Sequence, residues 1–349
     1  GDVRVDLTLN TDFAQVELDN QVANLSRFSL FMPEKRDFFL SNMELFTFGQ
    51  RGRNQILHTR RIGLDGGNEV PLLTGAKLSS QADDVFRMGV LQVTTRPTDE
   101  VPWTSHTVGR GQFELGGGSN LGFMLTHRQA LDQIEDRNVV VGVDGAWRGD
   151  GTPMLVTGFA ALSETSSLGE PARLGALGSV KLKWRGEVVR PELRYTFVHE
   201  DFEADLGYVQ RTNVHMLKPE LEFEPRPKAH GLEKIRIKLT HNSVLAGDTG
   251  DLLDWNVRTY AAVHWKRGYV AALTLRYDSE TVLEAFEVGT ETTIDPGAYH
   301  LMSAEVGVRT PGNQPVSVSA AVFGREYYGG GHARWGDGLD DSPCGRIST

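Results

Sequence analysis

The feature that most constrains the fold is a period-two alternation of apolar and polar residues that recurs along most of the chain. It is sharp from Val139 to Trp147, from Lys234 to Leu239 and from Asn256 to Trp265. Successive side chains of a β-strand point to opposite faces, so this alternation predicts strands with one apolar face. An early strand is expected over Val3–Leu9 and a short one over Ala14–Leu18. From residue 70 onward the pattern predicts strands at 70–80, 85–95, 105–115, 120–128, 138–148, 153–163, 174–185, 187–199, 203–210, 213–223, 232–242, 255–266, 269–278, 300–309 and 316–326.

The connections between these strands alternate in length. Short ones carry turn chemistry, as at 116–118, 148–151, 184–186 and 266–268, whereas longer polar ones fall at 95–105, 129–137, 163–173, 242–254 and 279–299. Short turns at one end and long loops at the other are typical of an outer-membrane barrel. A soluble β-propeller could alternate in the same way, but no blade-length repeat of about 40 residues with a shared signature is present. The chain is therefore predicted to be all-β, a large antiparallel outer-membrane-type β-barrel forming one domain over residues 1–349.

Composition narrows the possible functions. The chain has 349 residues, 39% of them hydrophobic, and a mean hydropathy of -0.31, as expected for a large barrel with a polar interior. The net charge of -10 argues against a nucleic-acid partner. No run of 18 apolar residues could form a spanning helix, although strands of about ten alternating residues could cross a membrane. Cys344 is the single cysteine, so no internal disulfide can form.

One segment near the start breaks the alternation. Thr8 to Phe46 packs acids, bases and aromatic residues densely and contains Pro33. It is expected to form a packed loop or short hairpin, with a helical turn around Asn42–Phe46. A charged, aromatic-rich segment ahead of many strands predicts that residues 8–63 fold inward as a plug facing the barrel lumen.

The charges of this N-terminal region provide the candidate site. Buried charges are costly unless they are paired, so opposite charges here are expected to form a network. As a functional site the network would be a plug or a ligand-facing cluster; as a structural one it would pin a loop inside the barrel, which is the more common role of buried ion networks. The predicted network residues are Asp12, Glu17, Glu34, Arg36, Arg60, Arg61 and Lys77.

Signatures of catalysis are not evident in the sequence. There is no HExxH motif, no His/Cys cluster and no G-x-S-x-G elbow, and the glycines at 116–118 lack the following helix and lysine of a phosphate-binding loop. We therefore expect no metal, no cofactor and no catalytic residue, although carboxylate pairs such as Asp83 and Asp84 leave a glycosidase open. Six tryptophans would form an interfacial aromatic girdle or, alternatively, fill turn edges: Trp103, Trp147, Trp184, Trp255, Trp265 and Trp335.

Several sequence fragments occur in the order of a known family. They are TLNTDFAQVELD, SRFSLFMPEKRDFFL, HTRRIGL, EVPLLTGAKLS, FEADLGYVQRT, IDPGAY and YYGG, and PEKRDFFL at 33–40 is the strongest of the matches. On these fragments the chain resembles the C-terminal β-barrel domain of unknown function that follows a carbohydrate-binding-module-family-nine-like domain in Gram-negative envelope proteins.

This resemblance implies a location in the outer membrane of a Gram-negative bacterium, with membrane lipid as a partner and carbohydrate as a candidate ligand. It also implies that the chain is a piece lacking the N-terminal carbohydrate-binding-like domain and the final strands, so that the barrel is expected to be incomplete. The expected function is passage or surface binding of a substrate, with a glycan as one candidate. Two alternatives remain: an envelope-associated carbohydrate-active hydrolase and a plugged structural scaffold. A non-enzymatic role is favoured.

Overall fold

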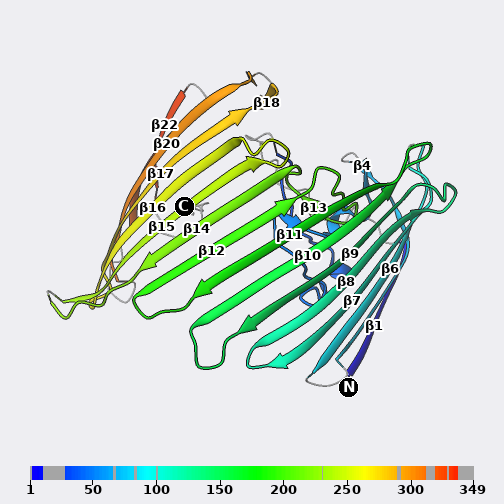
Figure 1. The fold of residues 1–349 in the computed structure, drawn as a ribbon, viewed down its shortest axis with the longest axis horizontal. Helices are drawn as coiled ribbons and strands as arrows, with labels where there is room; N and C mark the ends of the chain where they lie inside the picture. Colours follow the sequence, from blue (N-terminus) through cyan, green and yellow to red (C-terminus); the bar gives the residue numbers. More distant parts are fainter. Residues whose placement is uncertain are drawn as a thin grey trace. The chain divides into compact units, whose positions relative to one another are not determined.

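The computed structural model describes residues 2–10, 28–65, 68–81, 85–99, 101–229, 231–288, 292–311, 319–327 and 330–336 (Figure 1). Its largest sheet has 16 strands in the order β1-β5-β6-β7-β8-β9-β10-β11-β12-β14-β15-β16-β17-β20-β21-β22. The strands of this sheet are β1 (Asp2–Leu9), β5 (Leu72–Gln81), β6 (Phe86–Thr95), β7 (Thr104–Gly116), β8 (Ser119–Ala130), β9 (Arg137–Arg148), β10 (Met154–Ser166), β11 (Arg173–Trp184), β12 (Val189–Val198), β14 (Val214–Phe223), β15 (Leu232–Ala246), β16 (Leu252–Trp265), β17 (Val270–Val282), β20 (Gly297–Arg309), β21 (Ser319–Tyr327) and β22 (Gly330–Gly336).

The remaining elements are short. Three two-stranded sheets pair β2 with β13, β3 with β4 and β18 with β19. Their bounds, with those of the helices, are α1 (Asp37–Leu40), β2 (Asn54–Gln55), η2 (Thr59–Arg61), β3 (Leu64–Asp65), β4 (Asn68–Glu69), β13 (Tyr208–Val209), β18 (Phe286–Val288) and β19 (Thr292–Ile294). In the described part of the chain, no helix has the length and apolar character needed to cross a membrane.

The all-β prediction is confirmed, with one large antiparallel sheet. Closure of that sheet into a barrel is not confirmed, because no ladder joins β1 to β22 among the residues that the structure describes. Neighbouring strands follow one another in sequence, apart from the intervening short elements, so the large sheet is a meander. Such a meander follows from the regular turn signals that separate the alternating segments.

Most expected strands are present with shifted ends, and 203–210 is the clear exception. Only Tyr208 and Val209 are extended there, and they pair with Gln55 and Asn54 of the N-terminal segment. The peptide at Gly207 lies so close to that segment that an added Cβ would stand 2.3 Å from the Gln55 carbonyl oxygen. Contact with a distant part of the chain therefore overrides the local pattern. The short strand expected at 14–18 lies outside the described residues.

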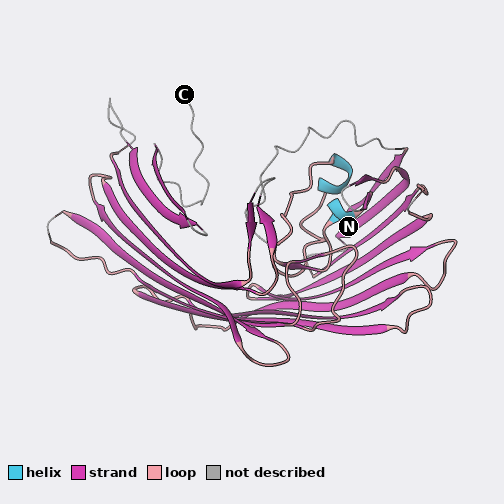
Figure 2. Ribbon diagram, turned by 90° about the horizontal axis from the view of Figure 1, so that it is seen from above, coloured by secondary structure: helices cyan, strands magenta, loops and turns pink. Residues whose placement is uncertain are grey.

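The chain divides into two compact units, one of residues 1–180 and 196–214 and the other of residues 181–195 and 215–349. In the first unit, the described part of the N-terminal segment packs on one face of the strands, which we call the inner face. Figure 2 shows α1 and the adjoining loops over this face. Phe48, with 1% of its surface exposed, lies edge-on to Phe159 of β10 at 5.7 Å between ring centroids. Ile56 and Ile62 are fully buried, so the hydrophobic core of this unit forms between segment and sheet.

The opposite, outer face of the first unit is apolar and exposed. One line of registered neighbours across five strands is Val90, Gly109, Leu125, Val141 and Leu162. The leucines and valines in it are 40–61% exposed. The adjacent line, one residue along each strand, is Leu91, Val108, Thr126, Val140 and Ser163, and none of these is more than 2% exposed. A single-residue step thus changes a side chain from the covered face to the uncovered one.

The second unit has the same apolar outer face but a charged inner face. Its outer line runs through Ile237, Ala261, Leu273, Val306 and Val322. Its inner face carries Lys and Arg side chains from five strands, with Glu side chains between them. These residues are Lys181, Lys183, Arg190, Glu192, Arg194, Lys218, Glu220, Glu222, Lys234, Arg236, Lys238 and Arg258.

Small residues of the inner face allow the segment to approach the sheet in the first unit. A Cβ at Gly142 of β9 would lie 2.6 Å from Cζ of Phe48. We predict that Gly142→Val lowers the free energy of unfolding by about 1–3 kcal/mol, because the buried phenyl ring has no free space to enter. Denaturant titration of the folded protein would measure this.

The matched control is Gly109→Val on the outer face, where nothing lies within 4 Å of the added Cβ. It should leave stability within about 0.5 kcal/mol of the parent. Equal effects of the two substitutions would contradict the packing described for the segment.

Candidate functional site

A buried ion pair lies at the centre of the N-terminal segment. Arg36 Nε donates to Glu34 Oε1 at 2.8 Å, and Arg36 Nη2 donates to Glu34 Oε2 at 2.7 Å. The two residues are 9% and 7% exposed. The backbone at Arg36 is extended, and side chains two residues apart in an extended chain lie on the same side. The spacing Glu-x-Arg within the phrase at 33–40 therefore sets up a bidentate, charge-neutral pair.

The same pair ties two stretches of the segment together. Arg36 Nη1 donates to the Ile62 carbonyl at 2.8 Å, and Nη2 donates to the Thr59 carbonyl at 2.7 Å. The Thr59 hydroxyl donates to Glu34 Oε2 at 2.8 Å. Burial alone would raise the pKa of the Glu34 carboxyl, but the hydrogen bond and the charge of Arg36 bring that pKa below its usual value. The pair is thus held ionised, and residues 33–36 are fastened to η2.

His58 lies beside this pair in an aromatic setting. Its ring centroid is 4.7 Å from that of Phe31 and 6.1 Å from that of Tyr208. The Tyr208 hydroxyl in turn donates to the Ser29 carbonyl at 2.5 Å. Burial lowers the pKa of His58 to about 4, although the Glu34 charge acts in the opposite direction. The imidazole is therefore neutral near pH 7, which suits a packing role among aromatic rings.

The other predicted network residues lie in different surroundings. Lys77 on β5 donates through Nζ to the carbonyls of Phe38 and Ser41, the latter at 2.6 Å, and so satisfies acceptors at the end of α1. Arg60 Nη1 is 3.4 Å from the Pro33 carbonyl oxygen, and Arg61 is exposed. Asp12 and Glu17 lie outside the described residues. The structure brings Glu34 and Arg36 into direct contact, places Arg60 next to them and gives Lys77 a separate anchoring contact.

A small cavity adjoins Lys77 and Thr59. A cavity of about 20 Å³ is lined by Thr59 and Lys77 together with apolar residues of the segment and of β6. A cavity of this size has room for about one water molecule. The described part of the cluster therefore has the geometry of a fastening between segment and sheet. Its part in ligand binding stays a prediction.

Further polar anchors in the first unit were not expected from the sequence. Arg110 of β7 forms a bidentate pair with Asp144 of β9, at 2.5 and 2.9 Å, and its Nε donates to the Leu45 carbonyl. Gln50 donates to both Ser179 Oγ and Thr196 Oγ1. The only sequence signal was a polar side chain at an inward position of an alternating strand. That signal cannot identify a partner far away in sequence.

The long connection between β12 and β14 adds an acid with a raised pKa. The Asp205 carboxylate is 3.4 Å from Arg128, which also pairs with Asp136 at 2.7 Å. Burial raises the pKa of Asp205 to about 6, against the lowering effect of Arg128. The Asn138 side-chain oxygen accepts a hydrogen bond from the Asp205 backbone at 3.2 Å. This network fastens the connection to β8 and β9.

In the second unit the inner-face charges converge on Glu224, just after β14. Arg236 donates to its carboxylate at 2.8 Å, and Arg190 and Lys234 each lie 3.4 Å away. Burial would raise the pKa of this carboxyl, but the Arg236 hydrogen bond and the surrounding cations lower it to about 2. Glu224 therefore remains ionised and links the end of β14 to β12 and β15 through the basic side chains of those two strands.

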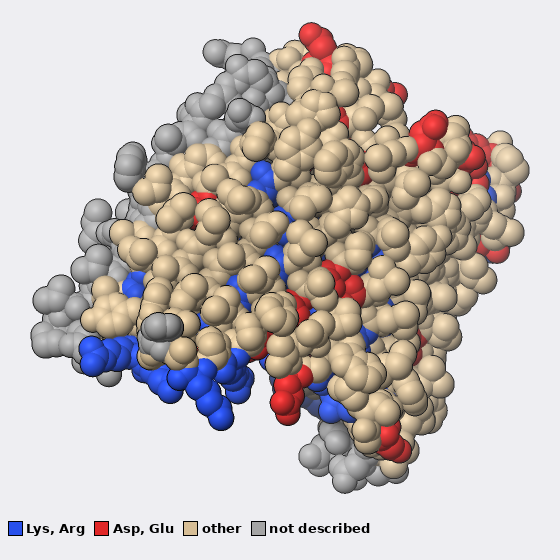
Figure 3. Space-filling model, turned by 60° about the vertical axis from the view of Figure 1, so that its left-hand side comes forward, with Lys and Arg blue, Asp and Glu red and all other residues tan. Residues whose placement is uncertain are grey.

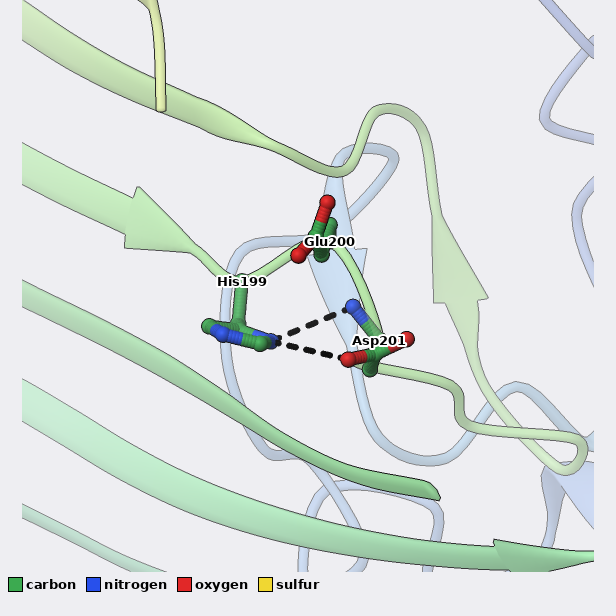
Figure 4. Close-up of side chains that lie close together, drawn as sticks. All are labelled: His199, Glu200 and Asp201. Atoms are coloured by element: carbon green, nitrogen blue, oxygen red, sulfur yellow. Dashed lines mark hydrogen bonds and ion pairs between the residues drawn. The ribbon is translucent and has the colours of Figure 1, made fainter. Parts of the chain in front are cut away.

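A His–Glu–Asp turn after β12 has the residue types of a metal site (Figure 4). Ligand-type atoms of His199, Glu200 and Asp201 lie within 4.8 Å of one another. However, His199 Nδ1 already accepts a hydrogen bond from the Asp201 backbone N–H at 3.2 Å and lies 3.8 Å from its carboxylate. The three residues are consecutive and partly or fully exposed. The arrangement is explained by local turn bonding.

The comparisons with known proteins place only the first part of the chain. A family model described as a domain of unknown function (DUF5916) matches residues 2–99. That stretch includes β1, the docked segment with its Glu34–Arg36 pair, and strands β5 and β6. No curated protein and no solved structure matches the chain. The expected domain of unknown function is thus supported, whereas its carbohydrate-binding context and envelope setting remain expectations.

The raised pKa of Asp205 predicts a pH dependence of stability. In the unfolded chain this carboxyl ionises near pH 4, but in the folded protein it keeps its proton up to about pH 6. The folded state thus binds more protons between these values, so this group makes stability fall as pH rises from about 4 to 6. Asp205→Asn should remove that fall, as measured by thermal unfolding across pH 4–8.

The difference between the stability profiles of the parent and of Asp205→Asn isolates the contribution of the Asp205 carboxyl. The neutral, buried His58 has the opposite dependence, because its stabilising effect is lost as pH falls from about 6.5 toward 4. Parallel stability profiles for parent and Asp205→Asn would show that the carboxyl has an ordinary pKa in the folded protein.

Proposed function

We propose that this chain forms the strand wall of an outer-membrane-type β-barrel, with its apolar outer face in lipid and its polar inner face toward an aqueous lumen. The observation that carries the proposal is the registered apolar line on the outer face of each unit. A soluble sheet would bury such a face against a second layer. Lipid is a solvent in which exposed Val, Leu and Ile side chains at these positions are favourable.

Aromatic side chains on the second unit support this arrangement. The rings of His241, Trp255, Tyr277 and His300 follow one another across four strands, with centroid distances of 6.2, 5.2 and 5.9 Å. The Tyr195 hydroxyl and His215 Nδ1 form a similar pair at 2.6 Å. Amphipathic rings in rows near strand ends are typical of the membrane–water interface.

The lengths of the connections between strands also agree with an outer-membrane barrel. Turns such as that at Gly116–Gly118, with φ of +60 to +81°, are tight, whereas the connection of β12 to β14 extends from His199 to Asn213. In outer-membrane barrels short turns face the periplasm and long loops face outward. The short-turn ends of the strands are accordingly the periplasmic ends.

The role we propose for this wall is passage or surface binding of a polar substrate, with a glycan as one candidate. The charged inner face of the second unit provides a polar surface for it. In the first unit the docked segment covers the inner face and would act as a partial plug. A plugged structural scaffold is the second candidate, favoured by the close packing of segment on sheet, where the cavity between them has a volume of only about 20 Å³.

A charged residue in the outer line provides the first test. Val143 of β9 is 55% exposed and lies at mid-strand. If this face meets lipid, Val143→Arg should destabilise the inserted protein by about 2–4 kcal/mol. The measurement is urea-dependent unfolding of the full-length protein from vesicles.

Ile134→Arg is the matched control, because Ile134 is 77% exposed but lies in the connection between β8 and β9. It should unfold as the parent does. If Val143→Arg were equally neutral, the outer face would be in water and the proposed membrane location would be wrong.

Conductance tests the role of the segment. Arg36→Ala leaves the Glu34 charge buried without its partner, which should loosen the plug and raise single-channel conductance of the full-length protein in a planar bilayer. Arg51→Ala, an exposed position on the same segment, should leave conductance unchanged.

Candidate oligosaccharides would be added in the same recordings. Block of the current by sugar would support a glycan site on the inner face. Unchanged conductance and unchanged stability of Arg36→Ala would show that the ion pair does not hold a plug. A protein that inserts and never conducts would favour the scaffold.

A further inference from the structure

A pocket lies at one edge of the second unit, apart from the cluster in the N-terminal segment. Its volume is about 820 Å³, and it lies at the tight turn between β16 and β17 and at the adjoining end of β20. The residues that line it are Gly231, Trp265, Lys266, Arg267, Tyr269, Val270, Ala271, Val308, Arg309 and Thr310. Lys, Arg and aromatic side chains are thus combined, and no acidic residue is among these lining residues.

Two backbone hydrogen bonds fix the conformation of the turn that shapes the pocket. The Trp265 backbone donates to the Tyr269 carbonyl at 3.0 Å, and the Gly268 backbone donates to the Trp265 carbonyl at 2.8 Å. Gly268 has φ +85°, a left-handed conformation that favours glycine. This turn fixes the strand ends from which the two aromatic residues, Trp265 and Tyr269, project. It also leaves Lys266 and Arg267 exposed at its tip.

The apolar wall of the pocket belongs to the outer face. Ala271 is registered with Val308 of β20 and with Val263 of β16, and Val308 is 51% exposed. The wall is therefore the end of the outer face of this unit, and the cations lie just beyond it. Figure 3 shows a face built mainly of uncharged residues, with Lys and Arg gathered along its lower-left edge.

We propose that this pocket binds an anionic phospholipid, with an acyl chain against Trp265 and Val308 and the phosphate beside Lys266 and Arg267. This inference rests on the proposed membrane location. Three features support it: apolar side chains continuous with the outer face, a Trp–Tyr pair of the kind found at headgroup depth, and three cations without a lining acid. Basic pockets near the membrane surface attract anionic headgroups. A soluble anion would not need the apolar wall.

The test uses dioleoyl phosphatidylglycerol with brominated acyl chains, titrated into the full-length protein in detergent micelles. Bromine quenches nearby tryptophan, so Trp265→Phe should lose the additional quenching by phosphatidylglycerol if the acyl chain lies in the pocket. Brominated phosphatidylcholine is the zwitterionic comparison, and inorganic phosphate is added as a competitor. Other tryptophans of the outer face, such as Trp147 and Trp184, would be quenched by either lipid, so the signal is the additional quenching that phosphatidylglycerol produces over phosphatidylcholine.

Lys266→Gln/Arg267→Gln should weaken phosphatidylglycerol binding by about 10- to 30-fold and leave phosphatidylcholine binding unchanged. The matched control is Arg185→Gln/Lys228→Gln, which removes two exposed cations of the same unit outside the pocket. It should bind phosphatidylglycerol as the parent does. This pattern, with Trp265 as the quenched residue, would support the proposal.

Three results would overturn it. Equal binding of the two lipids by parent and double variant would show that no headgroup site exists. Additional quenching by phosphatidylglycerol that persists in Trp265→Phe would place the lipid elsewhere. Displacement of the lipid by equimolar inorganic phosphate would indicate a soluble anion instead. Vesicle flotation separates the two proposals: a protein that inserts without preferring phosphatidylglycerol overturns only the pocket, whereas one that does not float overturns both.

Discussion

The buried Glu34–Arg36 ion pair is the interaction on which the first unit depends. Two charges removed from water are tolerable only as a pair whose remaining hydrogen-bonding capacity is satisfied, and here Thr59 and the carbonyls of η2 complete it. The pair fixes the path of residues 33–62, and that path places Phe48 and the adjoining apolar residues over the sheet. The ion pair thus holds the segment in the conformation whose apolar residues form the core, and contacts from Arg110 and Lys77 hold that segment on the sheet.

The two faces of the sheet differ in polarity and in how far they are covered. In the first unit the inner face is covered by protein, and its residues are almost inaccessible along the line from Leu91 to Ser163. In the second unit the inner face is kept polar by cations grouped around Glu224. The outer face is apolar in both units. The proposed membrane location would account for this asymmetry, with one face in lipid and the other in water. The pocket at the β16–β17 turn combines both characters, because apolar and basic residues line it.

Sequence reasoning predicted the strands well because a half-buried strand is encoded locally. Alternation over about ten residues is enough to identify β9 or β16, and glycine-containing turns mark their ends. It failed at 203–210, where pairing with Gln55 decides the backbone. It also missed the short strands β18 and β19, because three-residue segments carry no measurable period. For the site, it grouped Glu34, Arg36 and Lys77 in one charged network. In the structure Glu34 pairs with Arg36, two residues away, and Lys77 contacts the end of α1.

The sequence by itself determined the all-β class, the strand positions and which side chains share a face, because each follows from the two-residue period of an extended chain. It also determined that charges and aromatic residues are concentrated near the start. Only the tertiary structure decided which face is covered, which charges pair and which remain exposed. Arg110 meets Asp144 and Leu45, and Gln50 meets Ser179, through contacts between residues far apart in the chain. Such contacts depend on the register and curvature of the whole sheet, which no local pattern contains.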